Sequence, residues 1–429
     1  MAGDESQQRR AQNGAHPLKR HVAAVVAGNA LEFYDFIIFV FFVTVLGHLF
    51  FPPEIPEWVQ QLQAFGIFAA GYLARPLGGL VMAHFGDKLG RKRMFTLSIL
   101  LMALSTLGIA VLPTYASIGI AAPILLLTMR VLQGAAIGGE VPGAWTFVSE
   151  HVPVHRIGLA CGILTCGLTA GILLGSLIAT AINVVFTPDQ VMAYGWRIPF
   201  ALGGVFGLVA VYLRRWLDET PVFRELKAAK ALSEGLPLGE VLRGHKGATI
   251  LSMLLTWMLS GAIVVAILMT PTLLQTLYKI PAGEALTANS IATLFLTVGC
   301  VLAGLTVDRI GAGRFFTFGS IFLGAATWYF YSSVASDPSR LFLLQAVAGF
   351  SVGVIGAVPY VLVKAFPPAV RFTGVSFAYN IAYAIFGGLT PLLVTVALKS
   401  DPMAHAHYLV FLSAMGVCIG LYLWAKDRH

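Results

Sequence analysis

Long apolar stretches alternate with short polar breaks along almost the whole chain. Twelve of these stretches reach about 20 residues, the length that a helix needs to cross the hydrocarbon core of a bilayer. They begin near Val22, Val59, Met94, Ile118, Ile157, Arg197, Ala248, Leu286, Phe315, Leu341, Phe372 and His405. The pattern therefore predicts an all-α integral membrane protein with twelve transmembrane helices.

The composition agrees with a membrane location. Of the 429 residues, 57% are hydrophobic and only 11% are charged, with a mean hydropathy of +0.81, whereas soluble domains carry about a quarter charged residues. Residues 1–21 are polar and basic, and no small-residue cleavage site follows the first apolar stretch. We therefore expect a cytoplasmic tail there and no secretory signal peptide.

The net charge of +8 is placed asymmetrically. With the N-terminus inside, most of the 28 Lys and Arg residues fall on one side of the membrane. The other side receives only Arg197, Lys279, Arg340 and Lys399. This is the positive-inside distribution of an inner membrane protein of bacterial type. It predicts that both termini are cytoplasmic, and it explains the positive charge without a nucleic acid partner.

The longest polar break divides six predicted spans from six. The expected segments are a tail at 1–21, a bundle at 22–217, a cytoplasmic linker at 218–247, a second bundle at 248–425 and a tail at 426–429. An offset of 215 residues aligns Gly134 with Gly349 and Gly138 with Gly353. Such an internal repeat predicts two parallel six-helix units around a central cavity, the architecture of a rocking carrier.

Several motifs resemble those of one transporter superfamily. GDKLGRKR at 86–93 and RVLQGAAIGG at 130–139 resemble the loop and fourth-span motifs of the major facilitator superfamily. Five further motifs resemble the metabolite:proton symporter family within it: GNALEFYDF at 28–36, YLARPLGG at 72–79, YGWRIPF at 194–200, DETPVF at 218–223 and AIFGGLTP at 384–391. The last motif and the chain length are most similar to the citrate and dicarboxylate branch.

This resemblance implies a secondary active transporter that imports a small organic acid, such as citrate or 2-oxoglutarate, by proton symport with alternating access. The second reading is a proton symporter of a zwitterionic osmolyte such as betaine or proline, because that branch shares most of the motifs. An unpaired cation in the cavity would favour an anionic substrate, whereas a zwitterion would need an aromatic box beside the acid. A drug/proton antiporter ranks third, because the fifth span reads CGLTAGILLG and lacks GPxxGG.

Five charged residues fall inside predicted spans, namely Glu32, Asp35, Arg75, Arg130 and Glu140. A charge at this depth costs several kcal/mol unless it is paired or hydrated, so each one is a functional candidate. One interpretation is a purely structural network of ion pairs. The other is that Arg75 binds a substrate carboxylate with its planar, two-pronged guanidinium while an acid carries the proton.

The resemblance assigns roles within this group. It implies that Arg75 handles substrate, that Asp35 handles the proton with Glu32 as its rival, and that Arg130 adjusts the proton affinity of a nearby acid. We expect the carrier to change sides only when substrate and proton are both bound or both absent. Otherwise the closed, dehydrated carrier would contain an unpaired charge, which is costly.

Uncharged polar and aromatic residues in the spans are further candidates for the cavity wall. They are Asn29, Tyr34, Gln133, Trp257, Gln275, Tyr360, Asn380 and Tyr383. The alternative for each is simple packing or a place at the membrane interface. Asn29 and Asn380 are the stronger candidates, because an amide in lipid needs a partner.

A cytoplasmic latch is predicted from the loop motif. Its residues are Gly86, Asp87, Lys88, Gly90, Arg91 and Lys92, with Asp308 and Arg309 as a second copy and with Glu150, Arg156 and Arg371 in the same network. Glycine permits a tight turn, and Asp87 can pair with a basic group or meet a helix N-terminus. We expect this latch to stabilise the outward-open state; the alternative is positive-inside charge alone.

Enzyme motifs are absent or misplaced in the sequence. The GxSxG of a nucleophile elbow occurs at Gly349–Gly353 but inside an apolar stretch, where its strand-turn-helix setting is excluded. Neither HExxH nor GxxxxGK[ST] occurs, and the four cysteines lack metal-type spacing. We therefore expect a monomeric carrier, not an enzyme, without cofactor or metal, whose partners are an organic anion, a proton and the lipid bilayer.

Overall fold

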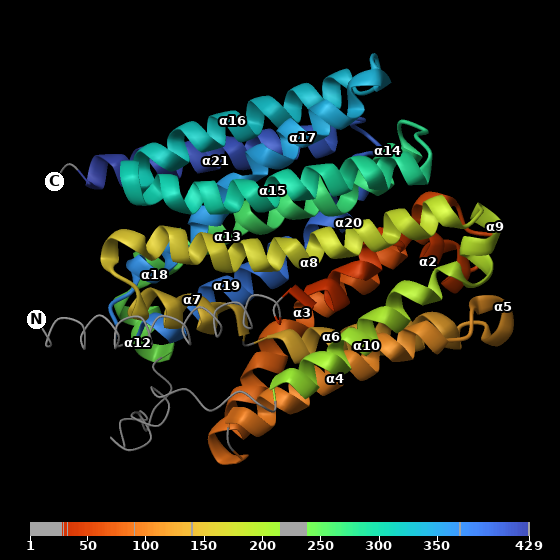
Figure 1. Cartoon of the computed structure of the whole chain (residues 1–429), viewed down its shortest axis with the longest axis horizontal. Helices are drawn as coiled ribbons and strands as arrows, with labels where there is room; N and C mark the ends of the chain where they lie inside the picture. Colours follow the sequence, from red (N-terminus) through yellow and green to blue (C-terminus); the bar gives the residue numbers. More distant parts are fainter. Residues whose placement is uncertain are drawn as a thin grey trace, which may run out of the picture.

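A computed structural model of the chain describes residues 28–214 and 238–427, apart from positions 29, 32, 90, 139 and 369. Every regular element in this part is helical, which confirms the predicted all-α class. Seven of the described helices are long and apolar enough to cross a membrane, and nine are if each bent pair counts as one span. In Figure 1, α13, α15, α16, α17 and α21 lie on one side of α8, and α3, α4, α6 and α10 lie on the other side, where α7, α18 and α19 are also seen.

The first six predicted spans each correspond to a helix or a group of helices. They are the pair Phe33–Phe41 and α2 (Val43–Phe50), α3 (Glu57–Leu89), α4 (Arg91–Val111), the pair α6 (Ala121–Ile137) and α7 (Glu140–His151), α8 (Ile157–Val185), and α9 (Pro188–Gln190) continued by a π-helical turn at Val191–Gly195 and α10 (Arg197–Arg214). The short α5 (Tyr115–Ile118) and a 3-10 turn at Val154–Arg156 lie in the connections. The first pair is bent by 67°.

The last six predicted spans are also helical. They are α13 (Lys246–Ile263) with a π-helical turn at Val264–Met269 and α14 (Thr270–Thr276), α15 (Ala282–Ile310), α16 (Ala312–Ser333), α17 (Leu341–Val352) with a 3-10 turn at Gly353–Ala357 and α18 (Val358–Ala365), α19 (Arg371–Ala382) with a π-helical turn at Tyr383–Gly387 and α20 (Gly388–Ala397), and α21 (Ala404–Lys426). The short α12 (Leu238–Gly244) precedes α13, and a 3-10 turn at Pro338–Arg340 precedes α17.

The aligned glycines occupy equivalent places in the two halves. A Cβ atom at Gly134 of α6 would lie 1.8 Å from the carbonyl oxygen of Gly71 in α3. A Cβ atom at Gly349 of α17 would lie 2.1 Å from the carbonyl oxygen of Ala292 in α15. In each half, the second and fourth spans therefore touch backbone to backbone, and only glycine fits at the contact.

The helix α8 joins the two groups of helices in the same way. A Cβ atom at Gly171 would lie 2.3 Å from the carbonyl oxygen of Ala30 in the first span. Near the other end, a Cβ atom at Gly158 would lie 2.6 Å from the carbonyl oxygen of Gly304 in α15. Small residues thus let α8 approach the first and eighth spans closely, as is common for helices in lipid.

Several inner spans depart from regular α-helix near their middles. The fourth has a turn at Gly138, and the tenth has a 3-10 turn that begins at the aligned Gly353. The seventh and eleventh contain π-helical turns at Val264–Met269 and Tyr383–Gly387. Such turns recur at functional sites because they redirect side chains from the regular helical faces.

Candidate functional site

Arg75 of α3 lies at the centre of a group of aromatic rings. Its side chain is fully buried, and its guanidinium carbon lies 4.9 Å from the ring centre of Tyr383, 5.6 Å from Tyr72, 5.8 Å from Tyr379 and 5.9 Å from Phe36. Within the described chain, none of its three side-chain nitrogens has a hydrogen-bond partner. We call these four rings the aromatic box.

The box is assembled from both halves of the chain. Tyr72 precedes Arg75 by three residues in α3, so the two side chains share one helix face. Tyr379 lies in α19 and Tyr383 begins the π-helical turn of the eleventh span. The rings of Tyr72 and Tyr383 stack with centroids 5.3 Å apart. Trp145 of α7 packs edge-on against Tyr379 at 5.0 Å, and this contact supports the box from outside.

Unpaired polar atoms converge on this box. Besides the Arg75 nitrogens, the hydroxyls of Tyr72 and Tyr383 have no partner at good hydrogen-bond geometry among the described residues, although Tyr72 and Tyr383 lie close enough to interact with each other, as do Arg75 and Tyr379. Buried polar groups in folded proteins are nearly always paired, and an unpaired one costs about 1–3 kcal/mol, more if it is charged. A single small ligand with acceptor oxygens could accept hydrogen bonds from all of these groups.

Asp35 of the first span lies in a separate niche. Its side chain is 1% exposed, and neither carboxyl oxygen has a hydrogen-bond partner within the part of the chain described. The niche is formed by glycines of α10: a Cβ atom would lie 2.6 Å from Oδ1 at Gly203 and 3.1 Å from Oδ2 at Gly207. No described basic residue forms an ion pair with Asp35.

Arg130 of α6 reaches the first span beside Asp35. Its Nη1 donates to the backbone carbonyl of Phe36 at 2.9 Å and to Oε1 of Gln133 at 2.7 Å. Gln133 in turn donates from Nε2 to the hydroxyl of Thr106 at 2.8 Å. The Thr106 methyl group lies at the Gly203 wall of the Asp35 niche. A chain of hydrogen bonds thus runs from Arg130 to the surroundings of Asp35.

These positions bear on the alternative of a purely structural ion-pair network. Among the residues that the structure describes, Asp35, Arg75 and Arg130 form no ion pair with one another. The ring of Phe36 separates the two cations, with its centre 4.5 Å from the Arg130 guanidinium carbon and 5.9 Å from that of Arg75. Among the described side chains, these three charges are therefore buried without an ion-pair partner, which a network of paired charges would not predict.

The predicted uncharged candidates lie in different places. Tyr383 belongs to the aromatic box, and Gln133 belongs to the Arg130 network. Asn380 donates from Nδ2 to the carbonyl of Gly138 at 2.9 Å, which ties the eleventh span to the break in the fourth. Its Oδ1 has no partner in the described part.

The remaining candidates lie away from the box. Tyr34 donates its hydroxyl to the carbonyl of Pro199 at 2.8 Å, on the side of α10. Gln275 donates to the carbonyl of Pro271 near the end of the seventh span, and Tyr360 accepts from Lys364 near the end of the tenth. Trp257 donates to Tyr408 and stacks on Phe386 at 4.1 Å, inside the C-terminal half.

Part of the predicted site falls outside what is described. Asn29, Glu32 and Gly90 lie outside the described residues. Gly86, Asp87, Lys88, Arg91, Lys92 and Glu140 are placed only as helix backbone, without a described side chain.

At the predicted cytoplasmic end, two contacts join the halves. Arg371 Nη1 lies 3.0 Å from Glu150 Oε1. Asp308 accepts hydrogen bonds from the backbone N–H groups of Gly158 and Leu159, both at 2.8 Å. These two groups begin α8, where unpaired N–H groups and the helix dipole favour an anion. Two other predicted latch residues, Arg156 and Arg309, are exposed.

The opposite end is closed by contacts between α3 and the eleventh span. Lys399 Nζ lies 2.9 Å from the ring centre of Trp58. Closer to the box, a Cβ atom at Gly388 would lie 3.1 Å from Tyr72 Cβ and 3.3 Å from the carbonyl oxygen of Ala69. Because the halves also meet at the other end, the structure is a closed conformation with Arg75 shut off from water.

Sequence reasoning missed four aromatic residues of this site, namely Phe36, Tyr72, Trp145 and Tyr379. One available signal was spacing, since Tyr72 lies one helical turn before Arg75 and Tyr379 lies one turn before Tyr383. Aromatic residues are frequent in spans, however, and their spacing alone does not bring two distant helices together.

Comparison with known proteins gives the family. A model of the family described as "Major Facilitator Superfamily" matches residues 31–391. The chain is 32% identical to the proline/betaine transporter of Salmonella typhimurium, over 94% of this chain and 83% of that one. It is 31% identical to the glycine betaine/proline/ectoine/pipecolic acid transporter OusA of Dickeya dadantii, over 95% and 83%.

Solved structures show the same fold. The proton:xylose symporter XylE bound to 6-bromo-6-deoxy-D-glucose matches with a TM-score of 0.74 and 19% identity, over 94% of each chain. The partially occluded inward-open conformation of the E. coli xylose transporter matches with a TM-score of 0.72 and 18% identity, over 94% of this chain and 96% of that one.

The comparisons correct one expectation and confirm another. They do not support the resemblance to the citrate and dicarboxylate branch, because the relatives carry betaine and proline in their names. The second reading, an osmolyte transporter, fits them better than the organic acid does. The expectation of a transporter that is not an enzyme is confirmed by the family match. The chain belongs to the major facilitator superfamily and is a multi-pass membrane transport protein.

Proposed function

We propose that this protein imports a small zwitterionic osmolyte, such as glycine betaine or proline, by proton symport with alternating access. The observation that carries the proposal is the buried guanidinium of Arg75, which has no hydrogen-bond partner among the described residues and lies within 5.9 Å of four ring centres. The names of the relatives support the same substrate class.

Both charges of a zwitterion find a matching group here. The carboxylate can accept two parallel hydrogen bonds from the Arg75 guanidinium, the strong geometry for this pair. The quaternary or secondary ammonium can lie against the ring faces of Tyr72, Tyr379 and Tyr383, because aromatic faces attract cations. In the closed conformation, the Arg75 guanidinium itself lies against part of the aromatic box, over the ring of Tyr383.

A dicarboxylate fits the same place poorly. Its first carboxylate would satisfy Arg75, but its second would face the electron-rich ring faces of Tyr379 and Tyr383, which repel anions. No second described cation lines the box, since the ring of Phe36 lies between it and Arg130. The electrostatics of the box therefore favour a substrate without net charge.

Asp35 is the proton carrier in this proposal. A buried carboxylate without a partner is far less stable than the same group in its neutral form. Closure around the substrate therefore requires that Asp35 bind a proton, and opening to water on the other side allows the proton to leave. Arg130 acts by holding the Phe36 carbonyl, one residue after Asp35. Glu32 and Glu140 remain alternative carriers outside the described side chains.

The latch belongs to the same proposal. The Glu150–Arg371 pair and the Asp308 contact with α8 hold the predicted cytoplasmic end closed, and the loop motif around Asp87 is the matching first copy. We place both termini and the linker at 218–247 on this side, in a bacterial inner membrane. The two six-helix bundles on either side of the linker then rock about the box.

Uptake into proteoliposomes tests the proposal. With an inward proton gradient, radiolabelled glycine betaine should accumulate above its external concentration, and a protonophore should abolish the accumulation. Unlabelled proline should compete, whereas citrate and 2-oxoglutarate should not. Uptake that the two acids inhibit and betaine does not would overturn the substrate class. Betaine accumulation that resists the protonophore would overturn proton coupling.

A further inference from the structure

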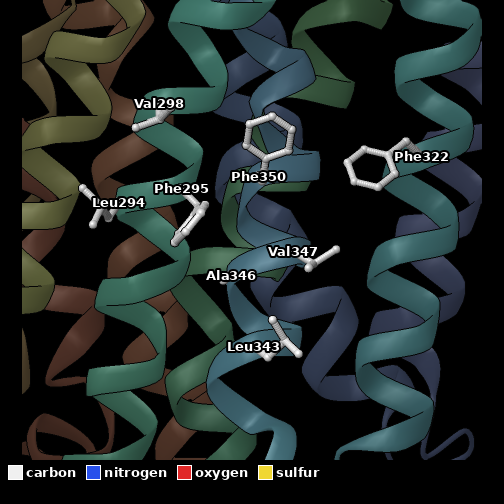
Figure 2. A pocket seen from close by; sticks show the side chains of 8 residues that line it. All are labelled: Leu294, Phe295, Val298, Phe322, Leu343, Ala346, Val347 and Phe350. Atoms are coloured by element: carbon white, nitrogen blue, oxygen red, sulfur yellow. The ribbon is translucent and has the colours of Figure 1, made fainter.

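An apolar groove runs along the outer surface of the C-terminal half, between α15, α16 and α17. Its main part has a volume of about 530 Å³ and is lined only by apolar side chains, among them Phe295, Val298, Phe322, Val347 and Phe350. Figure 2 shows these side chains on three neighbouring helices, with Phe350 and Val347 of α17 between the α15 side chains and Phe322 of α16. A second hollow of about 160 Å³ continues it and shares Phe322 and Phe350.

The groove exists because its three helices pack closely at other contacts. α15 and α17 approach each other directly, because Gly299 and Gly353 leave no room for a Cβ atom at their contact. α16 packs instead on α21, where a Cβ atom at Gly313 would lie 2.4 Å from the backbone of Trp424. Within the groove, α16 makes a close contact at Gly319, where a Cβ atom would lie 2.8 Å from Val354 Cγ2, whereas Phe322 contacts Phe350 only edge-on at 6.3 Å.

The part of the groove that follows α15 has about the length of one leaflet of a bilayer. Along α15 the lining extends from Leu294 in the main part to Thr306 in the second hollow, which at about 1.5 Å per residue is about 18 Å. Half of a hydrocarbon core of about 30 Å is about 15 Å. Along α15 the lining thus covers about this length and stops one helical turn before Ile310, on the predicted cytoplasmic side. On α17 it begins at Leu343, two residues after the opposite end of that helix.

Positive charge lies at that end. Arg309 is exposed and continues the lining face of α15, since it follows Leu302 and Thr306 at helical spacing. Arg314, at the start of α16, is also exposed and lies over the Trp424 ring at 5.6 Å. Of the nearby acids, Asp308 is engaged by two backbone N–H groups, and Asp427 Oδ2 lies 3.8 Å from the Cβ position of Gly311, in the turn between Arg309 and Arg314.

We propose that this groove binds one acyl chain of an anionic phospholipid whose phosphate lies at Arg309. The apolar lining takes the chain, and the arginine takes the headgroup. Anionic lipids are enriched in the cytoplasmic leaflet and are attracted by basic residues at its surface. The 3-10 turn of the tenth span forms part of the floor through Gly353 and Val354, so the lipid contacts the break in that span.

Purified, delipidated full-length protein tests the site. Phosphatidylglycerol or phosphatidylethanolamine is added, and native mass spectrometry counts the bound lipids. The wild type should retain one phosphatidylglycerol about fivefold more tightly than phosphatidylethanolamine. Val347→Trp, which fills the groove, should lose this lipid. Val410→Trp is the matched control, because Val410 of α21 is equally exposed, at 40% against 39%, and does not line the groove.

Arg309→Gln separates the two parts of the proposal. This variant should bind both lipids equally, because the acyl site remains and the headgroup contact is gone. Thermal unfolding in detergent confirms that each variant is folded. Retention of phosphatidylglycerol by folded Val347→Trp, or equal binding of both lipids by the wild type, would overturn the proposal. A dimer that Val347→Trp dissociates would show that a second copy occupies the groove, which would also overturn it.

Discussion

Arg75 of the second span and Tyr383 of the eleventh meet at the boundary between the two halves, where the guanidinium carbon lies 4.9 Å from the centre of the ring. Each residue is fixed to its own half, Arg75 in the α3 helix and Tyr383 in a π-helical turn. A rocking motion that separates the halves would pull them apart. The box is therefore complete only in a closed conformation, and a ligand that bridges it stabilises closure.

Replacing the guanidinium by an ammonium tests the carboxylate contact. Arg75→Lys keeps the charge but cannot offer two parallel donors to a carboxylate. A hydrogen bond to a charged group contributes about 1.5–3 kcal/mol, so the loss of one should weaken glycine betaine binding roughly 10- to 100-fold. The apparent affinity is read from uptake at varied betaine concentration. Arg340→Lys, at an exposed pair with Asp337, is the control and should leave it unchanged.

The ring of Tyr383 should matter more than its hydroxyl for the ammonium. Tyr383→Phe keeps the ring face, whereas Tyr383→Leu removes it with little loss of apolar volume. A cation–π contact of about 0.5–2 kcal/mol predicts that the leucine variant binds betaine roughly 2- to 30-fold more weakly than the phenylalanine variant. Equal affinities of the two variants, measured by betaine uptake, would contradict the aromatic box as the ammonium site.

Removing the titratable oxygen of Asp35 should uncouple transport from the proton. Asp35→Asn keeps the shape of the side chain in its glycine niche but cannot release a proton. Exchange of labelled for unlabelled betaine should continue, and accumulation driven by a proton gradient should vanish. Asp401→Asn, at a partly buried acid that pairs with His407 outside the spans, should retain both activities. Gradient-driven accumulation by the Asp35 variant would assign the proton to another group.

The contact of Asp308 with α8 should be visible in hydrogen exchange. Asp308→Asn replaces a charged acceptor of two backbone N–H groups by a neutral one and weakens the interaction with the helix N-terminus. The amides of Gly158 and Leu159 should exchange faster in the variant, together with the other contacts of the closed end. Asp337→Asn serves as a control away from α8. Unchanged exchange at α8 would remove Asp308 from the latch.

The glycine contact between α3 and α6 should not tolerate a methyl group. Gly134→Ala would place Cβ 1.8 Å from the Gly71 carbonyl oxygen, and overpacking of this kind costs about 1–3 kcal/mol. Its thermal unfolding temperature should fall below that of the wild type. Gly247→Ala is the control: nothing lies within 4 Å of its Cβ position in α13, and alanine favours a helix there. Equal unfolding temperatures would contradict the tight contact.

The sequence was sufficient for the helices but not for the site. Twelve spans could be predicted because lipid demands long apolar stretches whatever the packing. Arg75, Asp35 and Arg130 stood out for the same reason, since charge in lipid is rare. The equivalence of Gly134 and Gly349 followed from the internal repeat, which is found by comparing the sequence with itself.

What surrounds the charges could not be predicted. The niche of Asp35 depends on Gly203 and Gly207 of a span far along the chain, and one glycine among 45 carries no sign of its neighbour. The aromatic box depends on how the second span meets the eleventh. Without that contact the arginine suggested an anionic substrate, and the rings that favour a zwitterion were hidden among many aromatic residues.

Calorimetric titration of the purified protein with glycine betaine, and separately with 2-oxoglutarate, tests the central claim most directly. The wild type should bind betaine, the Arg75→Lys variant should bind it at least about tenfold more weakly, and neither should bind the dicarboxylate. Binding of 2-oxoglutarate in place of betaine, or betaine binding that the Arg75 substitution leaves unchanged, would contradict the account.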